Sequence, residues 1–248
     1  MTRNLRQRSG CGRLAAAVGL AAGAYVGYAS VTWWRYGRAT HSTRADAGSE
    51  LDRFMPVYEV REHHQIRIAA PAAVTIAAAR EMDLLGSFIV RAIIKARELI
   101  LGASPDTRPR PRGLLAEVQA LGWGVLADVR GREVVVGAAT QPWKANVVFR
   151  ALRPDEFAAF DEPGYVKIAW TLRADALGPD DSLFSTETRV VSTDRTARAR
   201  FRWYWAAFSP GIILIRWLSL RPLKVEAERR ASENSPGNRP LPVAEDVP

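Results

Sequence analysis

The sequence predicts an α+β protein in which an antiparallel sheet is followed by one long C-terminal helix, with a separate transmembrane helix at the N-terminus. Three observations support this prediction. A stretch of 21 residues without a charge lies near the start of the chain. Apolar and polar residues alternate through several segments in the middle of the chain, as they do in half-buried strands. From Asp194 to about Arg230, the apolar residues instead recur at helical spacing.

The composition indicates a folded domain without the clustered cysteines and histidines of a disulfide scaffold or a transition-metal site. The chain has 248 residues, of which 48% are hydrophobic, and this is enough to bury a core. One cysteine and three histidines are too few for a disulfide scaffold, a zinc finger or most transition-metal sites. We therefore expect no metal site, no cofactor and an organic binding partner.

The charge balance favours a membrane over a nucleic acid as the partner. Lysine and arginine number 35 against 26 aspartate and glutamate, which gives a net charge of +9. The excess is concentrated in an N-terminal cluster, in a loop at 108–112 and in the region from Arg195 to Arg230. Two of these three regions adjoin strongly apolar stretches, and none matches a motif that reads nucleic acid. We expect membrane contact and no nucleic acid.

The N-terminal segment is predicted to anchor the protein in a membrane. Residues 1–13 form a basic tail, and residues 14–34 are long enough as a helix to cross a bilayer core. Trp33 and Trp34 lie where one membrane interface would be. A cleaved signal peptide is the alternative, because Ala22-Gly23-Ala24 resembles a processing site. Arginines flank both ends of the span, so the side of the membrane stays open, and residues 35–53 are predicted to be a linker.

The globular part is predicted to begin with a strand and two helices. Residues 58–68 alternate as a first strand, and Pro71 then starts a helix that continues to Leu85. Ser87 can cap a second helix, which Gly102 ends. The strand is expected to pass into the first helix with almost no loop.

An antiparallel sheet and a long helix complete the predicted domain. The expected strands are residues 122–129, 132–140, 146–152, 165–174 and 182–191. Asp194 can cap the long helix, in which Pro210-Gly211 predicts a break. Residues 231–248 contain four prolines and few apolar residues, and are predicted to be a disordered tail.

This order of elements resembles the START-like superfamily, also called SRPBCC, which has the helix-grip fold and includes pollen-allergen-like carriers and polyketide cyclases. Residues 66–74 are similar to the strand end, alanine-proline pair and helix start of such domains, and residues 185–194 look like their closing strand and helix cap. The resemblance covers Tyr58 to Arg230, so we place the domain at 54–230. It implies a curved antiparallel sheet wrapped on the long C-terminal helix.

The sequence also departs from the superfamily pattern. Thr75 stands where an aromatic residue is common, and the span from Arg80 to Leu121 is longer and more helical than usual. The superfamily has no universal catalytic motif, so the resemblance informs the fold far more than the function.

A curved sheet on a straight helix is expected to leave an apolar cavity between them. Strand alternation and helical spacing predict the side chains that point into this space. The predicted lining is Trp123, Val125, Val166, Ile168, Trp170, Leu172, Tyr204, Phe208 and Ile212. A packed core without a ligand is the other interpretation of the same aromatic stripe.

No catalytic motif stands out, and no catalytic residue is predicted. His63 and His64 are neighbours on one strand and point to opposite faces, so they cannot share a metal. Glu187 and Arg189 are assigned to the outer face of their strand, where Lys167 or Arg173 could pair with them across the hairpin.

The leading hypothesis is membrane-anchored binding or transport of a hydrophobic small molecule or lipid, without chemical turnover. One alternative is a cyclase- or dehydratase-like enzyme that acts on an aromatic or polyketide-type substrate with Tyr204 or His64. Another is a non-catalytic membrane scaffold whose last helix docks a partner.

Overall fold

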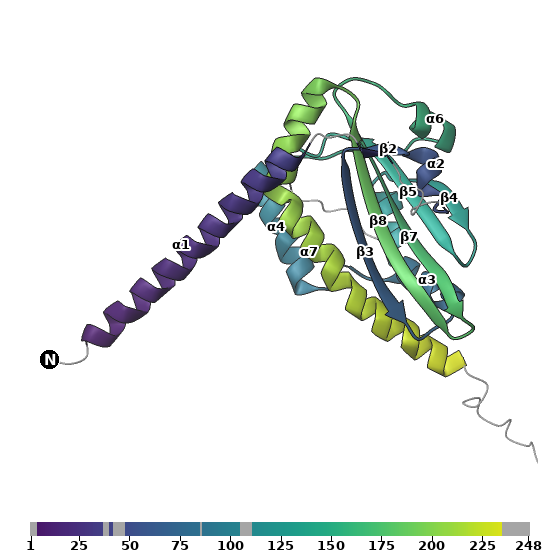
Figure 1. The fold of residues 1–248 in the computed structure, drawn as a ribbon, viewed down its shortest axis with the longest axis horizontal. Coiled ribbons are helices and arrows are strands. Elements are labelled where there is room, and N and C mark those ends of the chain that lie inside the picture. Colours follow the sequence, from purple (N-terminus) through teal and green to yellow (C-terminus); the bar gives the residue numbers. More distant parts are fainter. Residues whose placement is uncertain (1–3, 37–39, 42–47, 85, 105–110, 235–248) are drawn as a thin grey trace, which may run out of the picture.

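The computed structural model describes residues 4–36, 40–41, 48–84, 86–104 and 111–234, with side chains from residue 16 onward except those of 17, 18, 40 and 41. The predicted disordered tail lies outside these residues from position 235 onward. The fold is α+β, with a curved antiparallel sheet and a long C-terminal helix, as the sequence predicts (Figure 1).

The main sheet has six strands in the order β3-β8-β7-β5-β4, and β6 pairs with β5. All of its pairings are antiparallel. The strands are β3 (Val60–Ile68), β4 (Gly124–Val129), β5 (Glu133–Thr140), β6 (Phe149–Arg150), β7 (Val166–Gly178) and β8 (Asp181–Ser192). Gly131 joins β4 to β5 with a φ of 71°, which glycine adopts without strain. A separate pair, β1 (Thr40–His41) and β2 (Val57–Tyr58), lies beside it.

Two helices cover one face of the main sheet, which we call the inner face. They are α3 (Ala72–Glu81) and α7 (Arg195–Asn234), and α4 (Phe88–Leu101) and α5 (Leu114–Ala120) pack on them from outside. Figure 1 shows α7 running along the length of the curved strands. Pro71 starts α3 three residues after β3 ends, and Gly102 ends α4 with a φ of 68°.

The predicted break at Pro210-Gly211 is wrong, because α7 is one helix of 40 residues with Pro210 and Pro222 inside it. A proline in a helix interior removes a hydrogen bond, but packing can hold the backbone in place. At this point α4 lies against α7 so closely that a Cβ on Gly211 would come within 2.8 Å of the Ile93 Cγ2 atom. The contact with α4 therefore supports the helix where its own hydrogen bonding is weakest.

The other face of the sheet, the outer face, carries two short helices that the sequence analysis missed, α2 (Leu51–Phe54) and α6 (Pro154–Ala159). They cover a second apolar core, which includes Leu51, Phe54, Met55 and Phe157. Single helical turns have too few residues for a periodic pattern to reveal them.

Glu187 and Arg189 lie on this outer face, but their predicted partners are wrong. The Arg189 side chain is only 1% exposed and forms 2.6 Å ion pairs with Asp52 and Glu187. Among the described residues, Glu187 also pairs with Arg61, and not with Lys167 or Arg173. Arg189 also donates to the Met55 carbonyl oxygen. Helix α2 therefore encloses this arginine and neutralises it.

The N-terminal helix α1 (Asn4–Arg35) contains the whole of the predicted span 14–34. Within the part of the chain that the structure describes, no helix has the length and apolar character needed to cross a membrane. Ten of the 21 residues of the predicted span are alanine or glycine, which contribute little apolar surface. The transmembrane assignment is therefore not supported.

The last turns of α1 pack against α7, while its first part projects away from the domain (Figure 1). The Arg202 guanidinium lies 3.5 Å from the centre of the Trp33 ring, and the Trp33 and Trp203 rings are 5.7 Å apart. At the end of α1, the Tyr36 hydroxyl donates to the buried Glu59 carboxylate at 2.8 Å.

Glu59 connects α1, the main sheet and α7. Besides Tyr36, it accepts hydrogen bonds from the Ser192 hydroxyl at 2.8 Å and from the Arg198 side chain at 2.6 Å. Burial, followed by the nearby charge of Glu59, raises the pKa of Tyr36, so this hydroxyl stays protonated as a donor.

Candidate functional site

The side of α7 that faces the sheet is apolar except near its middle. The inward positions follow helical spacing, and they are Trp205, Ile212, Arg216, Leu220, Leu223 and Ala227. Such a stripe is expected to be apolar throughout, because it covers the core. Arg216 interrupts the stripe halfway between two apolar clusters.

Polar side chains occupy the matching place on the inner face of the sheet. Glu62 pairs with Thr188, and His64 pairs with Thr186, across strands β3 and β8. Thr188 is in turn opposite Trp170 on β7. We call Glu62, His64, Thr186, Thr188 and Arg216 the polar cluster.

Arg216 is the charged centre of the polar cluster. Its Nη1 atom donates to the Thr186 hydroxyl at 2.9 Å, and its guanidinium lies 5.6 Å from the centre of the Trp170 ring. Among the residues that the structure describes, no carboxylate lies within ion-pair distance of it. Burial lowers the pKa of Arg216 to about 10, and the charge of Glu62 opposes this shift.

The two titratable groups of β3 are also shifted. Burial raises the pKa of Glu62, although Arg216 acts in the opposite direction. Burial and the nearby Arg216 lower the pKa of His64, which is therefore neutral at pH 7. Both shifts reflect an interior that disfavours charge.

Two polar atoms of the cluster lack a partner. The His64 Nε2 atom and the Thr188 hydroxyl are buried and have no hydrogen-bond partner within the described residues. Buried polar atoms normally have such partners, so each exception calls for a physical explanation. A polar group of a bound ligand would explain both atoms, because it could serve as their hydrogen-bond partner.

A groove with a volume of about 410 Å³ opens beside the cluster, between α1, β3 and α7. We call it the α1 groove. It is lined by Tyr28, Val31, Thr32, Arg35, Tyr36, Glu59, Val60, Arg61, Glu62 and Trp205. Glu62 belongs both to this lining and to the polar cluster, so the groove adjoins the cluster at that residue.

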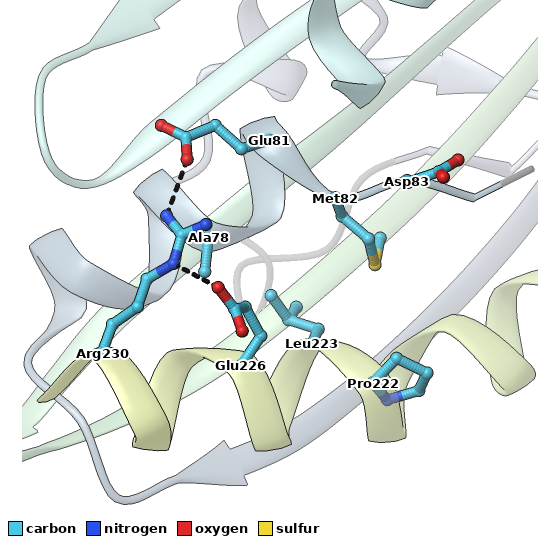
Figure 2. A pocket seen from close by; sticks show the side chains of 8 residues that line it. All are labelled: Ala78, Glu81, Met82, Asp83, Pro222, Leu223, Glu226 and Arg230. Carbon is cyan, nitrogen blue, oxygen red and sulfur yellow. Dashed lines mark hydrogen bonds and ion pairs between the residues drawn. The ribbon is translucent and has the colours of Figure 1, made fainter. Parts of the chain in front are cut away.

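A smaller cavity of about 250 Å³ lies near the other end of α7 (Figure 2). Its polar groups are already paired, because Arg230 forms 2.7 Å ion pairs with both Glu81 and Glu226. The same three residues join α3 to α7. The charged residues around this cavity therefore have a structural role, and we do not assign the cavity a ligand.

The nine residues predicted to line a cavity all lie on the inner side of the sheet or next to it. Trp170, Leu172 and Val166 are buried in two core clusters. Five more pack against those clusters, namely Trp123, Val125, Ile168, Tyr204 and Ile212. Phe208 contacts Tyr204, with their ring centres 5.1 Å apart. None of the nine lines either of the two cavities described above, so their ligand-binding role stays a prediction.

Of the polar cluster, only His64 is a candidate for chemistry from the sequence alone. The signal that could have found the rest is Arg216, the one charged residue in the apolar run from Trp203 to Leu220. Tyr204, the other candidate, lies outside the cluster and accepts a hydrogen bond from Arg97 at 3.2 Å. No group of three or more potential metal ligands occurs within the residues that the structure describes.

No family model matches the sequence, and no curated protein matches it. Similar solved structures include CalU16 from Micromonospora echinospora, at 12% identity over 69% of this chain and 85% of that one, with a TM-score of 0.24. A START superfamily protein from Mycobacterium smegmatis is 15% identical over 71% and 99% of the two chains, with a TM-score of 0.26. The Zhui aromatase/cyclase from a Streptomyces species is 15% identical over 69% and 94%, with a TM-score of 0.23. With TM-scores this low, the function of the chain has to be inferred from its own geometry.

Proposed function

We propose that this domain binds a hydrophobic small molecule or lipid beside a membrane, without chemical turnover. The observation that carries the proposal is the α1 groove, which combines apolar side chains such as Val31 and Trp205 with direct access to Glu62 of the polar cluster. Ligand sites are typically concave and mostly apolar, with a few polar groups that orient the ligand. The volume of about 410 Å³ lies within the usual range for such sites.

Exposed apolar side chains on neighbouring helices support membrane contact. Trp203 and Trp217 on α7 are 68% and 60% exposed, and Phe88 and Leu99 on α4 are 76% and 72% exposed. Both helices pack on one another, and α1 packs on α7. Arginines of the first turns of α7 lie next to this surface, which suits anionic lipid headgroups. A ligand could then enter the α1 groove directly from the lipid phase.

Ligand binding is tested by analysing lipids that co-purify with the full chain, and by titrating a fluorescent hydrophobic probe. We expect one or a few enriched species in the lipid extract. Val31→Trp fills the groove and should weaken probe binding by about tenfold or more, because the apolar surface is no longer accessible. Val225→Trp, at an exposed position of α7 outside the groove, is the matched control. Equal probe binding by both variants would contradict the proposal.

Membrane contact is tested by co-sedimentation with vesicles of phosphatidylglycerol and phosphatidylcholine. Trp217→Glu should reduce the bound fraction, while Leu177→Glu, at an exposed position in the β7–β8 hairpin, should not. Binding should also weaken as salt rises, because headgroup attraction is screened. Binding unchanged by Trp217→Glu would place the contact elsewhere.

The second candidate is a cyclase- or dehydratase-like enzyme for an aromatic or polyketide-type substrate. The observation in its favour is that Glu62 and His64 converge in one cluster with shifted pKa values, and that the buried His64 Nε2 atom has no partner among the described residues. A neutral histidine of this kind can act as a general base. Loss of water from a poly-β-ketone thioester, detected by mass spectrometry and abolished by His64→Gln, would favour the enzyme. The open groove supports either function over a purely structural scaffold.

A further inference from the structure

We propose that the polar cluster binds the carboxylate of a long-chain fatty acid, with Arg216 as the main donor and the chain in the α1 groove. This inference rests on the proposed function and adds the chemistry of the ligand head. It follows from the unused hydrogen-bond donors of Arg216, from the position of Glu62, and from the shape of the adjoining α1 groove.

Arg216 is a half-buried cation whose donors are mostly unused by the protein. A guanidinium has five N–H donors, and the described residues accept one hydrogen bond from it, at Thr186. A hydroxyl acceptor does not neutralise the charge. A cation inside a protein is costly unless a close anion and further hydrogen bonds compensate it. A ligand carboxylate would supply both, because its two oxygens match the planar fork of arginine.

Glu62 is the acidic residue of the polar cluster, so it is the expected partner of Arg216. Among the described residues, however, Glu62 and Arg216 form no ion pair. The charge of Glu62 would oppose a second carboxylate, so the two can be close only if one of them takes up a proton. Burial already favours the protonated form of Glu62. A protonated Glu62 could then donate a hydrogen bond to the bound carboxylate. At a pH where Glu62 is ionised in the free protein, fatty-acid binding should therefore be coupled to uptake of up to one proton.

The other groups around the cluster agree with this assignment. His64 faces the cluster as a neutral side chain, and the Thr188 hydroxyl is a buried donor without a partner in the described residues. Of the charged residues that line the groove, buried Glu59 is paired with Arg198 and Arg61 with Glu187, while Arg35 is a further cation on the α1 side. A phosphate head would bring up to two negative charges towards one arginine and Glu62, which this site cannot balance.

The adjoining groove offers an acyl chain apolar contacts among polar side chains. Val31, Val60 and Trp205 supply apolar wall on three different elements, α1, β3 and α7. Because Glu62 lies in both the groove and the cluster, a chain in the groove would place its head next to Arg216.

The test compares laurate with dodecanol, which has the same chain length and no charge, by displacement of a fluorescent hydrophobic probe from the full-length protein. We expect laurate to bind about 10- to 100-fold more tightly than dodecanol, the effect of hydrogen bonds to a charged group. Arg216→Met should remove this preference and leave the affinity for dodecanol within about twofold. Arg216→Lys should retain part of it, since a point charge replaces the fork. Arg221→Met, at an exposed position of the same helix, is the control.

The pH dependence tests the role of Glu62. Wild-type affinity for laurate should rise as the pH falls from 8 to 6, by up to about tenfold for each pH unit if one proton is taken up. Glu62→Gln should remove this dependence. Equal affinity for laurate and dodecanol in the wild type, or an unchanged preference in Arg216→Met, would refute the carboxylate site while leaving the proposed function standing. No binding of either compound would refute the proposed function itself.

Discussion

Replacing Arg216 with methionine should make the protein more stable, not less. Arg216 occupies an inward position of α7 between two apolar clusters. A residue kept there for ligand binding is expected to cost stability, whereas a residue kept for structure is expected to add to it. The sign of the change therefore distinguishes the two roles.

The magnitude follows from the contacts of the side chain. The lowering of the pKa of Arg216 from its ordinary value to about 10 corresponds to about 3 kcal/mol that disfavours the charged form in the folded protein. This cost is present at every pH below 10. The hydrogen bond to Thr186 returns about 1 kcal/mol, and the contact with the Trp170 ring returns about 0.5–1 kcal/mol. Methionine fills a similar volume without the charge, so we expect a gain of about 1–2 kcal/mol.

The assay is urea unfolding followed by tryptophan fluorescence, with the free energy of unfolding extrapolated to water. Arg221→Met, on the exposed side of α7, should change stability by less than about 0.5 kcal/mol. A loss of more than about 1 kcal/mol in Arg216→Met would refute the reasoning, since it would show that Arg216 stabilises the fold.

Three further predictions concern the fold. Arg189→Ala should destabilise the protein by about 2–3 kcal/mol in urea unfolding, because buried Glu187 keeps only Arg61 as a cation among the described residues and the Met55 carbonyl oxygen loses the Arg189 donor; a loss below about 1 kcal/mol would contradict this. Gly137→Ala should lower the free energy of unfolding by about 1–3 kcal/mol, because the new Cβ would lie 2.6 Å from the Leu126 Cδ1 atom. A variant as stable as wild type would contradict this, since it would show that the core can rearrange around the added methyl group. Backbone N–H groups of Ala197 and Gly164 lower the pKa of Asp194, so the stability it contributes is full above about pH 5 and falls as the pH drops through its ordinary value of 3.8. Thermal melting between pH 5 and 2 should show a smaller decrease in Asp194→Asn than in wild type.

The main sheet and its long helix could be predicted because their signals are local. Alternation in residues 165–174 and 182–191 places strands β7 and β8, although both extend further along the hairpin. Asp194 was expected to cap the last helix, and its carboxylate accepts from the Ala197 N–H at 2.9 Å. Each of these features depends on residues close together in the sequence.

Burial of charge on the outer face could not be predicted in this way. Arg189 and its partner Asp52 are 137 positions apart, and the helix that carries Asp52 is a single turn. Alternation gives the correct face for Arg189 but says nothing about what covers it. The same limit applies to the candidate site, where Glu62 and Arg216 come together only because β3 and α7 lie side by side.

The enclosed Glu59 carboxylate has a consequence for how cargo would be exchanged. Moving α1 outward would remove the Tyr36 hydroxyl from this buried carboxylate, which would keep Ser192 and Arg198 as its partners. The hydrogen bond from Tyr36 to Glu59 therefore helps to hold α1 against the domain at neutral pH. A ligand is then expected to enter and leave through the open α1 groove. The exchange rate should depend on the size of the ligand and not on a movement of α1.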